Sequence, residues 1–217
     1  MRLVSSWFLS VLLLVSHFAV GQELACNPNA DEKTAMKQAP GGAKRTSEHS
    51  MEVRTGSGTR RFIDQPPHDG ISGLHWLYCG YNALTKTHLI HKQHEALFSG
   101  QLLFEDSGKI LNAGHTVLFS NDGKKYLAIE QLSGMDGENW SVFDSDGKKV
   151  WRGYGGTSRK EKGISTTVSQ FEQPRWDAQG ELTARYVCME PAKGKGTVTL
   201  VESGKTWGWR GQVKCDQ

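Results

Sequence analysis

The sequence lacks the motifs that identify many enzyme classes. Its four cysteines include no Cys-x-x-Cys pair, which argues against thioredoxin-like redox chemistry and a cysteine-rich zinc site. The zinc-peptidase signature H-E-x-x-H is missing, and Gly204-Lys205-Thr206 lacks the first glycine of a phosphate-binding loop. No serine, histidine and aspartate fall in a recognisable catalytic order. The sequence therefore favours a binding protein over an enzyme and implies no cofactor.

An excess of charge of either sign is also missing. The chain carries 26 basic and 23 acidic side chains, and residues 1–21 contain only one of these, Arg2. A phosphate-binding surface needs a concentrated basic face, which a nearly neutral chain does not provide. We therefore expect no nucleic-acid partner.

A long apolar run occurs only near the N-terminus. Arg2 precedes an apolar stretch that includes Val11–Val15 and ends at Ala19-Val20-Gly21. Small residues at the third and last positions before a break suit a signal peptidase, and the run is too short to span a bilayer. We expect residues 1–21 to be a signal peptide and the mature chain to begin at Gln22. The expected location is secreted or periplasmic, without stable membrane insertion after cleavage.

Residues 22–73 differ in composition from the rest of the chain. A capping pair, Asn29 and Glu32, precedes a short helical stretch that Pro40-Gly41-Gly42 ends. The residues that follow are basic and rich in glycine, serine and threonine, with too few apolar side chains to fold alone. We expect a polar, basic N-terminal extension that is solvated or loosely docked. The alternative is a basic arm that binds an acidic surface.

Helical periodicity is nearly absent from residues 74–217, where apolar side chains recur at every second position. Leu111, Ala113, Val117 and Phe119 follow this spacing, and turn residues such as Asn121-Asp122-Gly123 separate the alternating segments. Side chains two apart share one face of a strand, and these turn residues suit tight hairpins. The sequence predicts an all-β domain over 74–217, with about ten short antiparallel strands in a meander, either β-prism-like or a sandwich.

The four cysteines lie after the expected cleavage site, at Cys26, Cys79, Cys188 and Cys215. An even number in an exported chain predicts two disulfides, for which three pairings exist. Cys188 and Cys215 end alternating strands in the last meander, whereas Cys26 and Cys79 flank the polar extension. We expect these two pairs, each of which would stabilise the fold by about 3–4 kcal/mol.

The histidines His88, His91 and His94 form an H-x-x-H-x-x-H run. Imidazole is a common metal ligand, so the run is a candidate centre for a metal-dependent hydrolase. Neither a strand nor a helix brings the three rings together, however. We expect solvated histidines in a polar loop that bind no metal tightly.

Tryptophan is abundant, and most of its rings are expected to fill the core. Trp151 and Trp209 follow hairpin turns, where strand ends are less buried. These two residues are therefore candidates for an exposed platform that stacks on sugar rings.

Residues 97–157 contain three features in a fixed order: L-x-x-G-x-x-x-L from Leu111 to Leu118, then SNDGKKYLAIEQ, then DGENWSVFDSDGKKVW. This order resembles the bulb-type (monocot mannose-binding) lectin domain. The resemblance implies a β-prism fold and a sugar site of the pattern Q-x-D-x-N-x-V-x-Y on one strand. The counterparts here are Gln131, Asp136, Asn139, Val142 and Phe143. Their spacing breaks the alternation and requires a bulge around residues 134–137.

A second likeness is internal. The segment WSVFDSDGKKVWRGYGGT (140–157) is similar to VTLVESGKTWGWRGQ (198–212), which indicates a repeated strand–turn–strand unit.

Because of the lectin resemblance, we expect a secreted or periplasmic non-catalytic binding module that binds a carbohydrate. Its expected partner is a glycan or a protein at the cell surface. The alternative function is a periplasmic inhibitor or immunity-type protein that blocks an enzyme. The expected ligand-binding residues are Gln131, Asp136, Asn139, Trp151 and Trp209.

Overall fold

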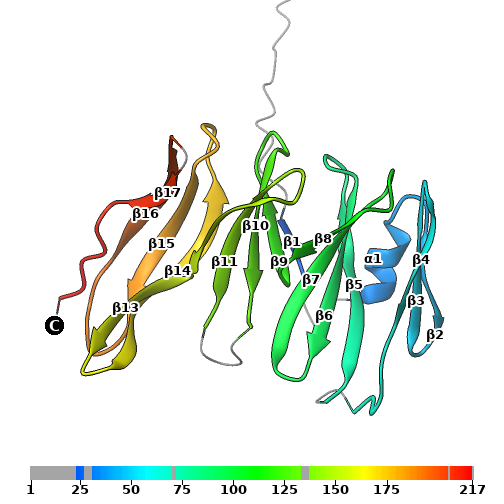
Figure 1. Ribbon diagram of the computed structural model, residues 1–217, viewed down its shortest axis with the longest axis horizontal. Coiled ribbons are helices and arrows are strands. Elements are labelled where there is room, and N and C mark those ends of the chain that lie inside the picture. The colour runs from blue at the N-terminus through cyan, green and yellow to red at the C-terminus, as the bar shows by residue number, and fades with distance from the viewer. Residues whose placement is uncertain (1–22, 27–30, 70–71, 133–136, 205, 217) are drawn as a thin grey trace, which may run out of the picture.

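The computed structural model describes residues 23–26, 31–69, 72–132, 137–204 and 206–216 (Figure 1). One short helix, α1 (Glu32–Lys37), accompanies seventeen strands in this part of the chain, and all sheet pairings between these strands are antiparallel. The prediction of an all-β, antiparallel fold is therefore confirmed. No helix among the described residues is long and apolar enough to cross a membrane.

The strands form four sheets, numbered I to IV here in their order along the molecule. Sheet I contains β2 (Ala43–Ser47), β3 (Ser50–Thr55) and β4 (Gly58–Ile63). Sheet II contains β5 (Leu74–Asn82), β6 (Thr87–His94), β7 (Leu97–Phe104) and β8 (Ile110–Ala113). Sheet III contains β1 (Glu23–Ala25), β9 (Thr116–Phe119), β10 (Lys125–Glu130), β11 (Asn139–Asp144) and β12 (Lys149–Tyr154). Sheet IV contains β13 (Gly156–Glu161), β14 (Ile164–Trp176), β15 (Leu182–Cys188), β16 (Lys195–Ser203) and β17 (Thr206–Arg210).

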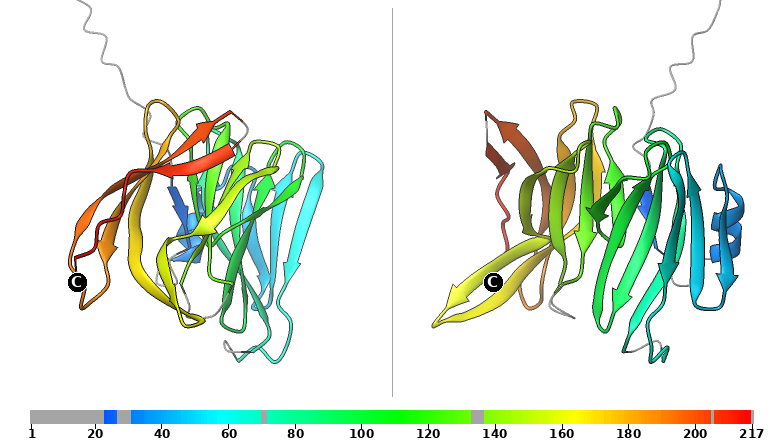
Figure 2. Two further views of the ribbon diagram at one scale, coloured as in Figure 1. Left: turned by 60° about the vertical axis from the view of Figure 1, so that its left-hand side comes forward. Right: turned by 45° about the vertical axis from the view of Figure 1, so that its right-hand side comes forward.

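The four sheets lie side by side as successive layers (Figures 1 and 2). Three apolar clusters fill the spaces between them, one between sheets I and II, one between II and III, and one between III and IV. Such face-to-face packing is that of a β-sandwich, here repeated along one direction. Sheets II and III are therefore covered on both faces.

Strand β11 illustrates how alternation serves two cores at once. Trp140 and Val142 enter the cluster shared with sheet IV, and Phe143 enters the cluster shared with sheet II. Ser141, on the same face as Phe143, is 1% exposed. Apolar residues on both faces show why this strand lies inside the stack.

Residues 22–73 differ from the solvated extension that their composition suggests. Strands β2 to β4 form a complete sheet, and Met51, Val53 and Phe62 are buried in the cluster with Ile90 and Leu103 of sheet II. The few apolar side chains are sufficient because they cover only one face and use the neighbouring sheet as their core.

The expected helix is present, but it is capped by a different residue. Asp31 is its N-cap and accepts hydrogen bonds from the Lys33 nitrogen (3.0 Å) and the Thr34 hydroxyl (2.7 Å). Asn29, the expected cap, lies outside the described residues. A carboxylate at this position satisfies a free backbone donor and interacts favourably with the helix dipole.

Both expected disulfides are confirmed. Cys26 pairs with Cys79, and Cys188 pairs with Cys215. The first joins the segment after β1 to β5 of sheet II, and the second joins the end of β15 to the C-terminal segment after β17. The first bond therefore ties a segment to the edge strand β5 of sheet II, and the second ties a segment to the central strand β15 of sheet IV.

The repeated strand–turn–strand unit also has a structural counterpart. Its copies form the last hairpins of sheets III and IV, β11–β12 and β16–β17. Trp151 and Trp209, which begin the shared Trp-Arg-Gly sequence, meet edge to face with ring centroids 5.7 Å apart. The two sheets thus place similar residues at their common boundary.

Candidate functional site

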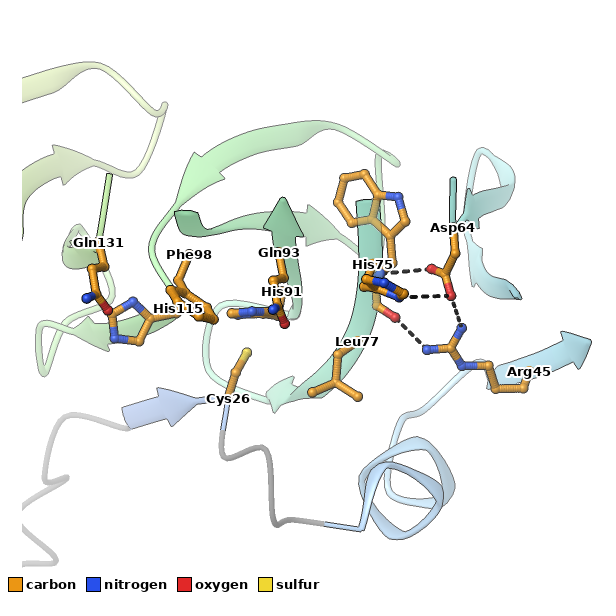
Figure 3. A pocket seen from close by; sticks show the side chains of 11 residues that line it. Cys26, Arg45, Asp64, His75, Leu77, His91, Gln93, Phe98, His115 and Gln131 are labelled. Carbon is orange, nitrogen blue, oxygen red and sulfur yellow. Dashed lines mark hydrogen bonds and ion pairs between the residues drawn. The ribbon is translucent and has the colours of Figure 1, made fainter. Parts of the chain in front are cut away.

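A cavity of about 400 Å³ lies where sheets I, II and III approach one another. Its volume falls within the range of small-molecule sites in proteins. Figure 3 shows polar side chains from all three sheets gathered around it. The lining residues are Cys26, Arg45, Asp64, His75, Trp76, Leu77, His91, Gln93, Phe98, His115 and Gln131.

Two imidazoles form one end of the cavity. His91 belongs to β6 and is 8% exposed, and His115 lies between β8 and β9. Their buried Nδ1 atoms make no hydrogen bond with another described residue. Burial lowers the pKa of both rings, that of His91 to about 4, and charge on His115 lowers the His91 pKa further. Both rings are therefore uncharged at neutral pH, when each offers one donor and one acceptor.

Aromatic and amide groups surround these imidazoles. The ring centroids of His91 and Phe98 are 5.8 Å apart. The backbones of Phe98 and Gln131 exchange two hydrogen bonds of 2.9 Å, which join β7 of sheet II to the end of β10 in sheet III. Gln93 lies two residues beyond His91 on β6, on the same face. This end of the cavity combines uncharged hydrogen-bonding groups with an aromatic ring.

The opposite end of the cavity is charged and centres on Asp64. Its Oδ2 atom lies 3.7 Å from Arg45 Nη1, 3.8 Å from His49 Nδ1 and 4.0 Å from His75 Nδ1. Arg45 also donates from Nε and Nη2 to the Glu32 carboxylate, at 3.0 and 3.1 Å. Two carboxylates therefore surround one guanidinium, and the arrangement favours internal ion pairing over capture of an anion.

Close backbone packing sets the position of His115. A Cβ atom on Gly114 would lie 1.8 Å from the Ile129 carbonyl oxygen, so only glycine fits between β8 and β10. The Cys26 nitrogen then donates a 3.0 Å hydrogen bond to the His115 carbonyl. Because Cys26 is bonded to Cys79, the first disulfide supports the same side of the cavity.

The residues expected from the lectin pattern do not all converge. Gln131 lines the cavity, but Asn139 is not among the described residues that line it. Asp136 lies outside the described residues. Both faces of β11 are covered by neighbouring sheets, so its polar face is not open to a ligand along its length. Of the expected residues that the structure describes, only Gln131 lines this cavity.

Trp151 and Trp209 occupy a different part of the molecule. Both are partly buried against the cluster between sheets III and IV. The centroid of the Trp209 ring lies 4.8 Å from that of Phe171, in an edge-on contact, and 6.4 Å from that of Trp140, in a tilted contact. These contacts place the pair at the edge of the core, away from the residues that line the cavity.

The three histidines of the H-x-x-H-x-x-H run all lie on β6, and the expectation of solvated rings in a polar loop is wrong. His88 is fully buried, His91 lines the cavity and His94 is exposed. The Nδ1 atom of His88 is 2.9 Å from the Tyr78 hydroxyl, and burial lowers the His88 pKa to about 4. The reason for the error is that both faces of β6 pack against other sheets. Among the described residues, no group of three potential metal ligands is positioned to hold an ion.

Sequence reasoning missed most of the cavity, including Arg45, Asp64 and His75. Their convergence depends on how sheet I docks on sheet II, which no local pattern encodes. His115 did leave a signal, because it occupies an apolar position in the alternating series from Leu111 to Phe119. A polar side chain at a position that should be buried is a candidate for a functional site.

The described lining residues include no hydroxyl or free thiol side chain, since Cys26 is in a disulfide. The arrangement supplies hydrogen-bonding groups and an apolar surface. Comparisons of the chain with known protein families, curated proteins and solved structures found no match.

Proposed function

We propose that the protein is a secreted or periplasmic non-catalytic binding module, and that the cavity at His91 and His115 binds an uncharged carbohydrate. The observation that carries this proposal is the convergence of two uncharged imidazoles, the buried His91 and the half-buried His115, with Gln131 beside the Phe98 ring. Sugar hydroxyls donate and accept hydrogen bonds, which neutral imidazoles and amides match. An aromatic ring provides an apolar surface for the less polar face of a sugar.

Two further observations support the proposed secreted or periplasmic location. Two disulfides form and persist in oxidising compartments, and they brace both ends of the described chain. The expected signal peptide at residues 1–21 agrees with export. Glycans of a cell wall or cell surface are accessible ligands in such a compartment.

Calorimetric titration of the purified protein with mannose-type and cell-wall oligosaccharides tests the proposal. Replacement of His115 by alanine should weaken binding by about 1–3 kcal/mol, the effect of losing one or two hydrogen bonds. His94→Ala is the matched control, because His94 is exposed and does not line the cavity. Unchanged affinity in His115→Ala, with the fold intact, would refute the proposed site.

A second candidate function is binding of a protein, as an inhibitor or immunity-type protein would do. Leu97 and Leu132 are 36% and 39% exposed, and they flank the paired residues Phe98 and Gln131 at the cavity. Exposed apolar side chains near a hollow are typical of protein interfaces. Replacing both leucines by serine should abolish capture of a protein partner while leaving oligosaccharide binding unchanged. Capture of a protein partner that is unchanged by the double substitution contradicts this second candidate.

A further inference from the structure

A second hollow lies between sheets III and IV, on the other side of sheet III from the cavity. It consists of two adjoining parts of about 730 and 330 Å³ that share Gly137, Tyr154 and Gln170. The hairpin of β13 and β14, which extends beyond the rest of sheet IV in Figure 2, forms one wall. We call this hollow the β12–β14 groove.

The larger part of the groove has an uncharged polar lining. Hydroxyl groups come from Tyr154, Ser158, Ser165 and Thr167, and an amide comes from Gln170. The Tyr154 and Thr167 hydroxyl oxygens are 3.5 Å apart, so the two groups face one region. The described residues that line this part include no charged side chain. Hydroxyls both donate and accept hydrogen bonds, which suits a ligand rich in hydroxyl groups.

The groove and the cavity are lined by residues that are close together in the sequence. Gln131, just after β10, lines the cavity, whereas Gly137 and Glu138, just before β11, line the groove. The Tyr154 hydroxyl packs directly on Gly137, since a Cβ there would lie 2.0 Å from its oxygen. The Glu138 carboxylate also acts on His115, whose pKa it raises against the effect of burial.

Elements that line the two hollows reach the same end of the stack. The end of β10, the start of β5 and the turn between β13 and β14 all lie at the lower edge of Figure 1. Packed sheets are about 10 Å apart, so the two hollows, on either side of sheet III, are separated by roughly 10–20 Å. One extended ligand is long enough to occupy both.

We propose that the β12–β14 groove binds the continuation of the same ligand, so that the protein recognises an extended, uncharged oligosaccharide and not a single sugar unit. This inference rests on the proposed function of the cavity. An extended peptide is the less suitable occupant, because peptides bound along strands use backbone pairing and apolar side-chain pockets. The larger part of the groove instead presents side-chain hydroxyls and an amide, and the smaller part adds the carboxylates of Glu138 and Glu172, which accept hydrogen bonds from ligand hydroxyls.

Calorimetry with a series of mannose oligosaccharides, from one to six units, tests the inference. Affinity should rise at least tenfold between the shortest members that bind and the hexasaccharide, because the second contact forms within an existing complex. Thr167→Val combined with Gln170→Ala should remove this gain and leave the affinity for short members unchanged. Thr59→Val, at an exposed strand position of sheet I, is the control and should keep the full gain.

The outcomes separate this inference from the proposed function. His115→Ala should weaken binding of every chain length, whereas the groove variant should affect only the long chains. Equal affinity for short and long chains, or a gain that survives the groove substitutions, overturns the inference and leaves the cavity proposal standing. Competition by an uncharged ten-residue peptide at the groove, with affinity equal to that of the hexasaccharide, would also overturn it. Failure of every oligosaccharide to bind refutes both.

Discussion

His91 and His115 line one cavity from separate elements, and a positive charge on His115 lowers the pKa of His91. His91 is placed by the pairing of β6 within sheet II, and His115 by the passage from sheet II to sheet III. Burial is the larger cause of the low pKa values, so the fold keeps both rings uncharged at neutral pH. The same two rings therefore link the stability of the protein to its site.

The first prediction concerns pH. The pKa of His91 and of His88 is about 4 in the folded protein and about 6.5 in an unfolded chain. Between these values the unfolded chain binds more protons, so the free energy of unfolding should decrease as the pH falls from about 6.5 to 4. The loss is complete below the folded pKa and amounts to about 3 kcal/mol for each histidine.

Urea denaturation between pH 7.5 and 4 measures this effect. His91→Gln should reduce the pH dependence, because glutamine has no proton to bind in either state. His94→Gln is the control, since His94 is exposed. Identical pH dependence in wild type and His91→Gln would contradict the prediction.

The second prediction concerns sheet I. Met51 is fully buried between sheets I and II, whereas Ile63 on the neighbouring strand is 56% exposed. Met51→Ala should lower the free energy of unfolding by about 2–5 kcal/mol, because it opens a cavity in a packed core. Ile63→Ala should change it by less than about 0.5 kcal/mol. Equal effects in chemical denaturation would show that sheet I does not share the core.

The fold was predictable where a signal is local. Alternation indicated an antiparallel β fold, and the positions of the cysteines identified both disulfides. Sheet I was not predicted, because its buried face, at Met51, Val53 and Phe62, is too small to form a core alone. Its stability comes from sheet II, and contact between distant segments leaves no periodic pattern in the sequence.

The candidate site was less predictable for the same reason. Gln131 entered the expected set through a family resemblance, whereas Asp64 and His75 come together only when β5 pairs beside the segment that follows β4. The His88–His94 run was recognised as unusual, but the burial of His88 and His91 depends on sheets that cover β6 from both sides. The sequence shows the types of residue that form the site, but it does not show that these residues come together in the folded chain.

The third prediction concerns the disulfides. Cys26–Cys79 joins residues 53 positions apart, and Cys188–Cys215 joins residues 27 positions apart. In the chain-entropy model the longer loop stabilises slightly more, with roughly 4 kcal/mol from each bond. Paired serine substitutions at either bond should lower the free energy of unfolding by that order. Only the serine substitutions at Cys26 and Cys79 should also weaken ligand binding, because Cys26 lines the cavity. Calorimetric titration of both variants at a temperature where they remain folded checks this, and equal loss of binding in both contradicts it.

The last prediction concerns Gly114, which precedes His115. A Cβ atom here would lie 1.8 Å from the Ile129 carbonyl oxygen, and the obstacle is backbone, which cannot rotate away. Gly114→Ala should therefore separate the strands locally and cost about 3 kcal/mol or more. The displacement should expose His115 and return its pKa toward the ordinary value, because burial is the main cause of its depression.

Gly208→Ala on β17 is the control, since no atom lies within 4 Å of the added carbon. Thermal denaturation measures the stability of both variants, and NMR titration follows the His115 ring. Wild-type stability and an unchanged His115 titration in Gly114→Ala would show that the close contact does not position the histidine.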